Sequence, residues 1–311
     1  MRINERTSGV FAVAPTPFRP DGGVDDASLD RMVDAYETAG CAGITILGVM
    51  GEAPKLEQDE ALSIVTRVVR RSRIPIVVGV SAPGFATMRR LARAALEDGA
   101  AGVMIAPAPA LRTDDQIAAY FEQAVLAIGD DVPVVVQDYP LSTSVLMSPA
   151  LIRRIVQALP SCVMLKHEDW PGLDKISTLR GYEAEGSMRR TSILCGNGGL
   201  FLDFEMARGA DGAMTGYAFP EMLVDVVTLA GTKDRERLHD IFDAHLPLLR
   251  YEQQQGIGLA VRKHLLRRRG FIAHETQRKS FGGLTDAGRA DVEVLLGRLA
   301  RKDPRATLTL R

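Results

Sequence analysis

The residue whose position most strongly suggests chemistry is Lys166. It ends an apolar run that begins at Cys162, and the polar residues His167, Glu168 and Asp169 follow it directly. An amine at the end of a buried strand is partly desolvated, which disfavours its ammonium form. A neutral lysine amine can attack a ketone and form an imine. The alternative is a structural lysine whose head group reaches water or pairs with one of the two carboxylates that follow it.

Other polar or flexible residues stand at the ends of neighbouring apolar runs. Glycines in the loop 48–52 allow backbone N–H groups to approach a carboxylate, and Glu52 is expected to brace that loop. Tyr139 is a candidate proton shuttle, with a packing role as the alternative. Gly196–Gly199 is read as a tight turn in preference to a phosphate-binding loop. The candidate substrate-binding residues are Gly48, Val49, Met50, Gly51, Glu52, Gln137, Thr215 and Gly216.

Composition excludes several classes of function. The formal net charge of −1 gives no global field that would attract nucleic acid or an anionic membrane. The three cysteines form no CxxC pair, and the five histidines show no metal-ligand spacing. No apolar run reaches the ~18 residues of a membrane span, and the N-terminus lacks a signal-peptide core. We therefore expect a cytoplasmic protein that needs neither a metal nor an organic cofactor.

Short apolar runs rich in β-branched residues recur along the chain and predict eight strands. Their lack of strict alternation is typical of parallel strands buried on both faces. The predicted strands are Gly9–Ala14, Ala42–Leu47, Ile74–Gly79, Gly102–Ala106, Pro133–Gln137, Cys162–Lys166, Ser192–Cys195 and Gly212–Thr215.

Stretches with helical periodicity separate these strands. The five that the pattern predicts most clearly are Ala27–Ala39, Gln58–Arg71, Thr87–Asp98, Ile117–Ala127 and Ala150–Ala158. Thr113 opens a capping box before one helix, and Ser148 followed by proline caps another. A Gly-x-x-Gly phrase recurs at residues 40, 99 and 209, where its first glycine suits a left-handed helix C-cap.

Eight strand–helix alternations within about 220 residues predict a (β/α)8 barrel, an α/β fold of the TIM type. A doubly wound sheet is the alternative, but no GxGxxG follows the first strand. Helical patterns continue over Phe219–Leu249, Gly256–Gly270 and Asp286–Lys302, and Asp303–Arg311 is expected to be a loose tail. We predict a barrel over residues 1–230 and a C-terminal helical region over residues 231–311. The strand C-termini of such a barrel form its active face, which gathers the candidate residues around Lys166.

Several motifs together resemble the dihydrodipicolinate synthase / N-acetylneuraminate lyase family. They are Pro15–Phe18 with Asp21-Gly22, the loop Gly48-x-x-Gly51-Glu52, the strand Val163–Glu168, Gly209–Gly216 and Arg262–Gly270. The resemblance covers roughly residues 8–300. It implies a class I lyase or aldolase that acts on pyruvate or another 2-oxo acid, with Lys166 as its Schiff-base lysine. It also implies a homo-oligomer, a dimer or a tetramer.

The chain departs from the synthase branch of this family at the site. Val49 and Met50 stand where the synthases have two threonines, and Gln137 stands where they have a catalytic tyrosine. The tyrosine of the partner subunit falls near Pro109, and the arginine that holds the second substrate falls near Ser142. Neither the threonine–tyrosine proton relay nor that arginine is present.

Three hypotheses follow. The leading one is a lyase or aldolase in which Lys166 forms an imine with a 2-oxo acid, the Gly48–Glu52 loop holds the carboxylate, and Tyr139 or water moves protons. The second is 4-hydroxy-tetrahydrodipicolinate synthase activity, as in lysine biosynthesis, with a rearranged relay that uses Gln137 and Tyr139. The third is a non-catalytic barrel that binds a ligand.

Overall fold

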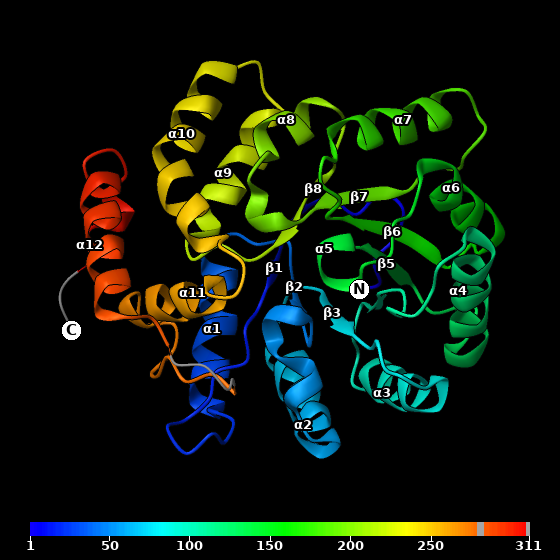
Figure 1. Cartoon of the computed structure of the whole chain (residues 1–311), viewed down its shortest axis with the longest axis horizontal. Coiled ribbons are helices and arrows are strands. Elements are labelled where there is room, and N and C mark those ends of the chain that lie inside the picture. The colour runs from blue at the N-terminus through cyan, green and yellow to red at the C-terminus, as the bar shows by residue number, and fades with distance from the viewer. Residues whose placement is uncertain (279–282, 309–311) are drawn as a thin grey trace.

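The computed structural model describes residues 1–278 and 283–308. Within them, eight parallel strands close into a barrel in sequence order, so that β8 pairs with β1 (Figure 1). The strands are β1 (Gly9–Val13), β2 (Gly43–Ile46), β3 (Ile76–Gly79), β4 (Gly102–Ile105), β5 (Val134–Asp138), β6 (Cys162–His167), β7 (Ser192–Cys195) and β8 (Gly212–Thr215). Each matches a predicted strand to within two residues at either end, and the predicted (β/α)8 barrel is confirmed.

Helices form a layer outside the strands, and further helices follow the barrel at the C-terminal side (Figure 1). Those between strands are α1 (Asp26–Thr38), α2 (Gln58–Arg71), α3 (Phe85–Glu97), α4 (Asp114–Ile128), α5 (Pro140–Thr143), α6 (Pro149–Ala158), α7 (Leu173–Ala184) and α8 (Leu202–Ala207). After β8 come α9 (Pro220–Ala230), α10 (Arg235–Glu252), α11 (Gly258–Arg268) and α12 (Asp286–Ala300). Short 3-10 turns are η1 (Val49–Gly51), η2 (Ala53–Lys55), η3 (Asn197–Gly199) and η4 (Pro304–Ala306).

Local sequence signals account for the helix ends. The Thr113 hydroxyl accepts from the Gln116 N–H at 3.3 Å, and the Gln116 side chain accepts in return from the cap backbone, which completes the expected capping box. The Ser148 hydroxyl caps α6 by accepting from the Leu151 N–H, and proline occupies the first helical position. Gly40, Gly99 and Gly209 have φ values of +82°, +103° and +95°, so the repeated glycine does end helices in the left-handed conformation.

The apolar core has two layers. Side chains that point outward from the strands pack against the surrounding helices, while an inner cluster fills the barrel lumen. The inner cluster includes Phe11, Val77, Met104, Val135 and Met164. Since these residues fill the lower lumen, any polar chemistry is confined to its upper end, where the strands terminate.

The helical predictions needed three corrections. The stretch Phe219–Leu249 is two helices, because a turn at residues 231–234 separates α9 from α10. The helices α5, α7 and α8 were not predicted, since α5 and α8 have only 4 and 6 residues and α7 has little amphipathic pattern. The expected loose tail is also wrong for its described part: Asp303 and Ala306 are buried, and only residues 309–311 of that segment lie outside the described structure.

A buried hydrogen-bond chain fastens this tail to the barrel. The Tyr217 hydroxyl, just after β8, lies 2.9 Å from His245 Nδ1 on α10, and His245 Nε2 lies 2.8 Å from Asp303 Oδ2. Burial lowers the pKa of His245, even though Asp303 acts against that shift. Burial alone would raise the pKa of Asp303, but hydrogen bonds from Arg305 and His245 outweigh it and bring the value to about 2.

We expect acid to loosen this attachment. Because the pKa values of His245 and Asp303 are both lowered on folding, both groups contribute stability that declines on acidification. The His245 contribution declines below its ordinary value of 6.5, and the Asp303 contribution declines between about pH 4 and pH 2. Asp303→Asn is expected to cost about 2 kcal/mol in the free energy of unfolding near pH 7 and to flatten the decline between pH 4 and pH 2. Urea unfolding as a function of pH measures both effects, and an unchanged profile would contradict this role.

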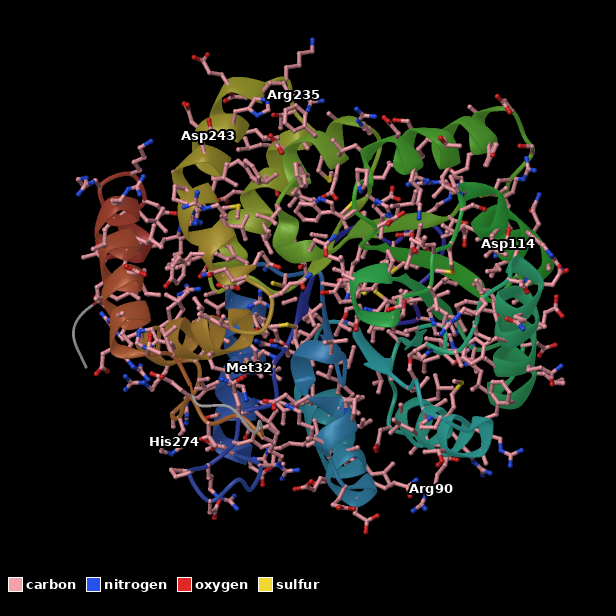
Figure 2. The ribbon with its side chains drawn as sticks, in the orientation of Figure 1. Met32, Arg90, Asp114, Arg235, Asp243 and His274 are labelled. Atoms are coloured by element: carbon pink, nitrogen blue, oxygen red, sulfur yellow. The ribbon has the colours of Figure 1, made fainter. Side chains whose placement is uncertain are left out.

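Charged side chains are spread over the surface. Arg90, Asp114 and Arg235 project from the periphery of the molecule, whereas Met32 lies inside it (Figure 2). No helix among the described residues combines the length and the apolar character needed to cross a membrane.

Candidate active site

A small cavity of about 50 Å³ opens at the C-terminal end of the barrel strands. Several strand ends and part of the C-terminal helical region contribute to its wall. Its lining residues are Val13, Val49, Met50, Gln137, Tyr139, Lys166, Glu168, Asn197, Gly198, Thr215, Gly216, Gln253 and Arg262. Seven of the ten residues proposed from the sequence are in this set, and Lys166 lies inside the ring of strands.

The alternation of side chains along β5 and β6 determines which residues enter the cavity. On β6, Met164 belongs to the lumen cluster, so Lys166 and Glu168 follow it on the same face. On β5, Val135 belongs to that cluster, so Gln137 and Tyr139 follow in the same way. Gln137 and Tyr139 therefore both line the cavity.

Lys166 has a carboxylate as its nearest charged partner. Its Nζ lies 3.1 Å from Oε2 of Glu168, and both side chains are less than a tenth exposed. The Gln137 Nε2 donates to the same oxygen at 2.7 Å, which is consistent with the pairing of Gln137 and Lys166 in register between β5 and β6. The alternative drawn from the sequence, a lysine paired with one of the carboxylates that follow it, is thus what the structure shows, and Glu168 is a buried acceptor beside the amine.

The backbone after β6 and β7 holds Glu168 in this position. The Glu168 N–H donates to the Asp138 carbonyl at 2.8 Å, and the Asn197 side chain donates to the Glu168 carbonyl at 3.0 Å. Gly196 leaves room for the carboxylate, because a Cβ at that position would overlap the Glu168 side chain. A glycine is therefore required beside the Lys166–Glu168 pair.

Tyr139 lies on the same wall as this pair. Burial raises the pKa of its phenol, Glu168 adds to the shift, and Arg262 opposes it. The Tyr139 hydroxyl makes no hydrogen bond to another described residue, so it is free to donate to a ligand.

One part of the Gly48–Glu52 loop faces the cavity, and another part holds the loop in place. Val49 and Met50 line the cavity, whereas Gly48, Gly51 and Glu52 do not. Glu52 Oε1 accepts from Lys263 Nζ at 2.8 Å, and its Oε2 accepts from Lys55 Nζ at 2.9 Å. Burial would raise the pKa of Glu52, but these two cations outweigh it and lower the value. This carboxylate thus braces the loop against α11 and does not line the cavity.

Thr215 and Gly216 form the wall after β8. The Thr215 hydroxyl accepts from the Gly198 N–H at 2.8 Å, and so the glycine cluster is the expected tight turn. Gly216 allows the Arg262 guanidinium to approach, because a Cβ there would overlap Arg262 Nη1.

A second ionic cluster lies on the outer side of the same strands. Lys175 Nζ donates to Asp138 Oδ2 at 2.8 Å and to the Met147 carbonyl at 2.7 Å, and it lies 2.5 Å from Asp169 Oδ2. None of these residues lines the cavity. Over the described residues, no group of three or more His, Cys, Asp or Glu side chains is arranged to hold a metal ion.

Six lining residues were missing from the candidates proposed from the sequence: Val13, Glu168, Asn197, Gly198, Gln253 and Arg262. Glu168 had a usable signal, since it lies two residues after Lys166 and thus on the same face of an extended chain. Gln253 and Arg262 had none, because only the tertiary fold brings the C-terminal helical region over the barrel.

Known proteins resemble this chain along nearly its whole length. The model of the dihydrodipicolinate synthetase family matches residues 6–299. An L-2-keto-3-deoxyarabonate dehydratase of Azospirillum brasilense is 30% identical, with 94% of this chain and 95% of the relative covered. A 4-hydroxy-tetrahydrodipicolinate synthase of Sorangium cellulosum is 34% identical, and the match covers 67% of this chain and 68% of the Sorangium protein.

Solved structures agree with this match. The crystal structure of a dihydrodipicolinate synthase from Rhodopseudomonas palustris superimposes with a TM-score of 0.94 and 60% identity, and the match covers 96% of this chain and 99% of that one. With its closed eight-stranded barrel and a match to the family model from residue 6 to residue 299, the chain belongs to the dihydrodipicolinate synthetase family and is a lyase of that type.

Proposed function

We propose that this protein is a Schiff-base lyase that acts on a 2-oxo acid through Lys166. The observation that carries the proposal is the buried pair of Lys166 and Glu168, 3.1 Å apart at the upper end of the barrel lumen. An ammonium group cannot attack a carbonyl, and Glu168 is positioned to accept the proton that the amine must lose. The site thus holds a nucleophile and its base in contact.

The proposed reaction passes through an iminium ion and an enamine. The Lys166 amine adds to the 2-oxo carbon, and Glu168 returns the proton that it took from the amine to the departing hydroxyl, which leaves as water. An iminium ion and a Glu168 carboxylate remain. That ion withdraws electrons from the adjacent carbon, so Glu168 can remove a proton from carbon 3 and form an enamine. The enamine can expel a hydroxide from carbon 4 as water once a proton is supplied, and the Tyr139 phenol is a candidate donor. In an aldolase, which is the alternative to this elimination of water, the bond between carbons 3 and 4 forms or breaks instead.

Elimination of water is the outcome that the site favours. Gln137 stands at the position of the synthase tyrosine and cannot relay protons, but it fixes the Glu168 carboxylate with a 2.7 Å hydrogen bond. A dehydratase of a 2-keto-3-deoxy sugar acid is 30% identical across 94% of the chain. We therefore propose a 2-oxo acid with a hydroxyl group on carbon 4 as the substrate. The homo-oligomer and the cytoplasmic location stay predictions from the sequence.

The second candidate is 4-hydroxy-tetrahydrodipicolinate synthase activity. Two similar proteins favour it by name, the Sorangium synthase and the Rhodopseudomonas dihydrodipicolinate synthase, of which the latter is 60% identical. Joint consumption of pyruvate and aspartate semialdehyde would support it. Consumption of a 2-keto-3-deoxy acid alone, with release of water, would support the dehydratase.

Hydride trapping tests the Schiff base itself. A panel of 2-oxo acids, beginning with pyruvate, is offered to the protein together with cyanoborohydride, which reduces an imine to a stable amine. We expect the acid to stay attached to one lysine, and peptide mass spectrometry to locate the adduct at Lys166. Lys175 is an internal control, because it is also buried but is hydrogen-bonded to Asp138 and the Met147 carbonyl outside the cavity. A folded protein that gives no adduct with any member of the panel would refute the proposal.

A further inference from the structure

Gln253 is a polar side chain of the cavity wall that has no task in the reaction described above. It caps the C-terminal end of α10, and it lines the cavity together with Lys166. Its backbone N–H closes the helix by donating to the Leu249 carbonyl at 3.1 Å. Its side-chain amide makes no hydrogen bond to another residue that the structure describes. Since an amide both donates and accepts, it is suited to a hydroxyl group, which does the same.

Other polar groups of the wall are already paired within the protein. The Gln137 amide donates to the Glu168 carboxylate at 2.7 Å. The Arg262 guanidinium forms an ion pair with the buried Glu252, which balances its charge. The amide of Gln253 has no such partner, and it is therefore available to a ligand.

The turn after β7 determines where this amide lies. A Cβ on Gly198 would come within 2.2 Å of Gln253 Nε2 and 2.3 Å of its Cδ, so the amide packs directly on that glycine. The Gly198 N–H in turn donates to the Thr215 hydroxyl at 2.8 Å. Gly198 and Thr215 both line the cavity. The amide therefore rests on the wall formed by the ends of β7 and β8.

Exposure distinguishes a floor of the cavity from its rim. Lys166 and Glu168 are only 5% and 6% exposed, whereas Tyr139 and Gln253 are half-buried. A substrate joined to Lys166 through carbon 2 must extend from the floor toward the rim. Because Tyr139 is the candidate proton donor at carbon 4, Gln253 is arranged to meet a group farther along the substrate.

We propose that Gln253 binds a hydroxyl group beyond carbon 4 of the substrate, so that the enzyme selects 2-oxo acids of at least five carbons. This inference rests on the proposed function, because it names a feature of the substrate that reacts with Lys166. The carboxylate at the other end of the substrate is left to the backbone of the Gly48–Glu52 loop. Gln253 thus determines specificity and takes no part in forming the imine or the enamine.

The test compares two ligands that differ in a single hydroxyl group, 4,5-dihydroxy-2-oxopentanoate and 4-hydroxy-2-oxopentanoate, each in both configurations at carbon 4. The concentration needed for half-maximal hydride trapping is measured, and adducts of the intact acid, its dehydrated form and pyruvate are counted together. Wild-type protein is expected to be trapped at a lower concentration of the dihydroxy acid.

Gln253→Leu keeps the size of the side chain but removes both of its hydrogen-bonding groups. It is expected to raise the concentration needed for the dihydroxy acid roughly 3- to 30-fold and to leave trapping by the monohydroxy acid and by pyruvate nearly unchanged. Gln253→Glu keeps an acceptor for the hydroxyl and is expected to retain part of the preference between the two acids.

Gln254→Leu is the matched control. Gln254 is the next residue, but its Nε2 donates to the Tyr251 carbonyl at 2.9 Å, and it does not line the cavity. Its preference between the two acids is expected to equal that of the wild type. Trapping by pyruvate shows that each variant is folded around an intact Lys166, because pyruvate is too short to reach the rim.

The outcomes separate the two proposals. If wild-type protein is trapped by pyruvate but shows no preference for the dihydroxy acid, or if Gln253→Leu keeps the full preference, the assignment of Gln253 is overturned and the Schiff base stands. An equal loss for all three ligands would also overturn it, since that pattern indicates a structural role. If wild-type protein is trapped by no 2-oxo acid, both proposals are overturned together.

Discussion

Replacing Lys166 by Arg is expected to abolish enamine formation while the protein stays folded. The exchange of pyruvate methyl protons in D₂O, followed by NMR, reports enamine formation without knowledge of any second substrate. We expect the exchange rate to fall on the order of 10⁴-fold or more, because a guanidinium cannot form the imine on which the later steps depend. The hydride-trapped adduct should disappear in parallel.

Arginine is the informative substitution because it keeps a cation beside Glu168. Alanine would leave a carboxylate buried at 6% exposure without its partner, and breaking a buried pair in that way costs about 3–5 kcal/mol. Lys175→Arg is the matched control, since Lys175 is buried on the outer side of the same strands. The control should keep exchange. Persistent exchange in the Lys166→Arg variant would remove the basis of the proposed mechanism.

Glu168→Gln is expected to have the next largest effect, a loss of exchange on the order of 10²- to 10⁴-fold. The amide keeps the volume of the side chain and its place beside Gln137, but it cannot accept a proton from Lys166 or from carbon 3. Hydride trapping should survive at a reduced rate, because imine formation can still use water as the base. Exchange and trapping together thus separate the role of Glu168 from that of Lys166.

Asp169→Asn is the control for this substitution. Asp169 is the next residue, but its carboxylate pairs with Lys175 outside the lumen. The two losses are directly comparable, since both changes remove one carboxylate from the same segment. Equal effects of the two substitutions on exchange would indicate that net charge, and not position in the cavity, explains the loss.

Glu168 takes the place of the synthase proton relay in the proposed mechanism. The threonine and tyrosine hydroxyls of that relay are absent from the matching positions, and the Glu168 carboxylate, two residues after the lysine, contacts both Lys166 and Gln137. In the proposed mechanism Glu168 therefore combines two tasks, deprotonation of the amine and deprotonation of the bound substrate. This arrangement needs Gly196, since any Cβ there would displace the carboxylate.

The linear sequence was sufficient to locate the barrel and most of one wall of the site. Eight strands were predicted because buried parallel strands appear as short β-branched runs, and their order placed Lys166, Gln137 and Thr215 at one end of the barrel. The alternation along β5 explains why Tyr139 shares a face with Gln137, two residues earlier, and both line the cavity. These features depend on local periodicity, which a linear chain displays directly.

Tertiary structure alone decided which of the two following carboxylates the lysine contacts and what closes the site above it. Glu252 and Arg262 are 86 or more residues after Lys166 in the chain and lie on α10 and α11, whose patterns predict helices but no docking position. The inward direction of Glu168 depended on a glycine that follows the next strand, and the outward direction of Glu52 depended on Lys263 of α11. Periodicity is a property of neighbouring residues, whereas the pairing of buried charges depends on distances between segments that only the folded chain brings together.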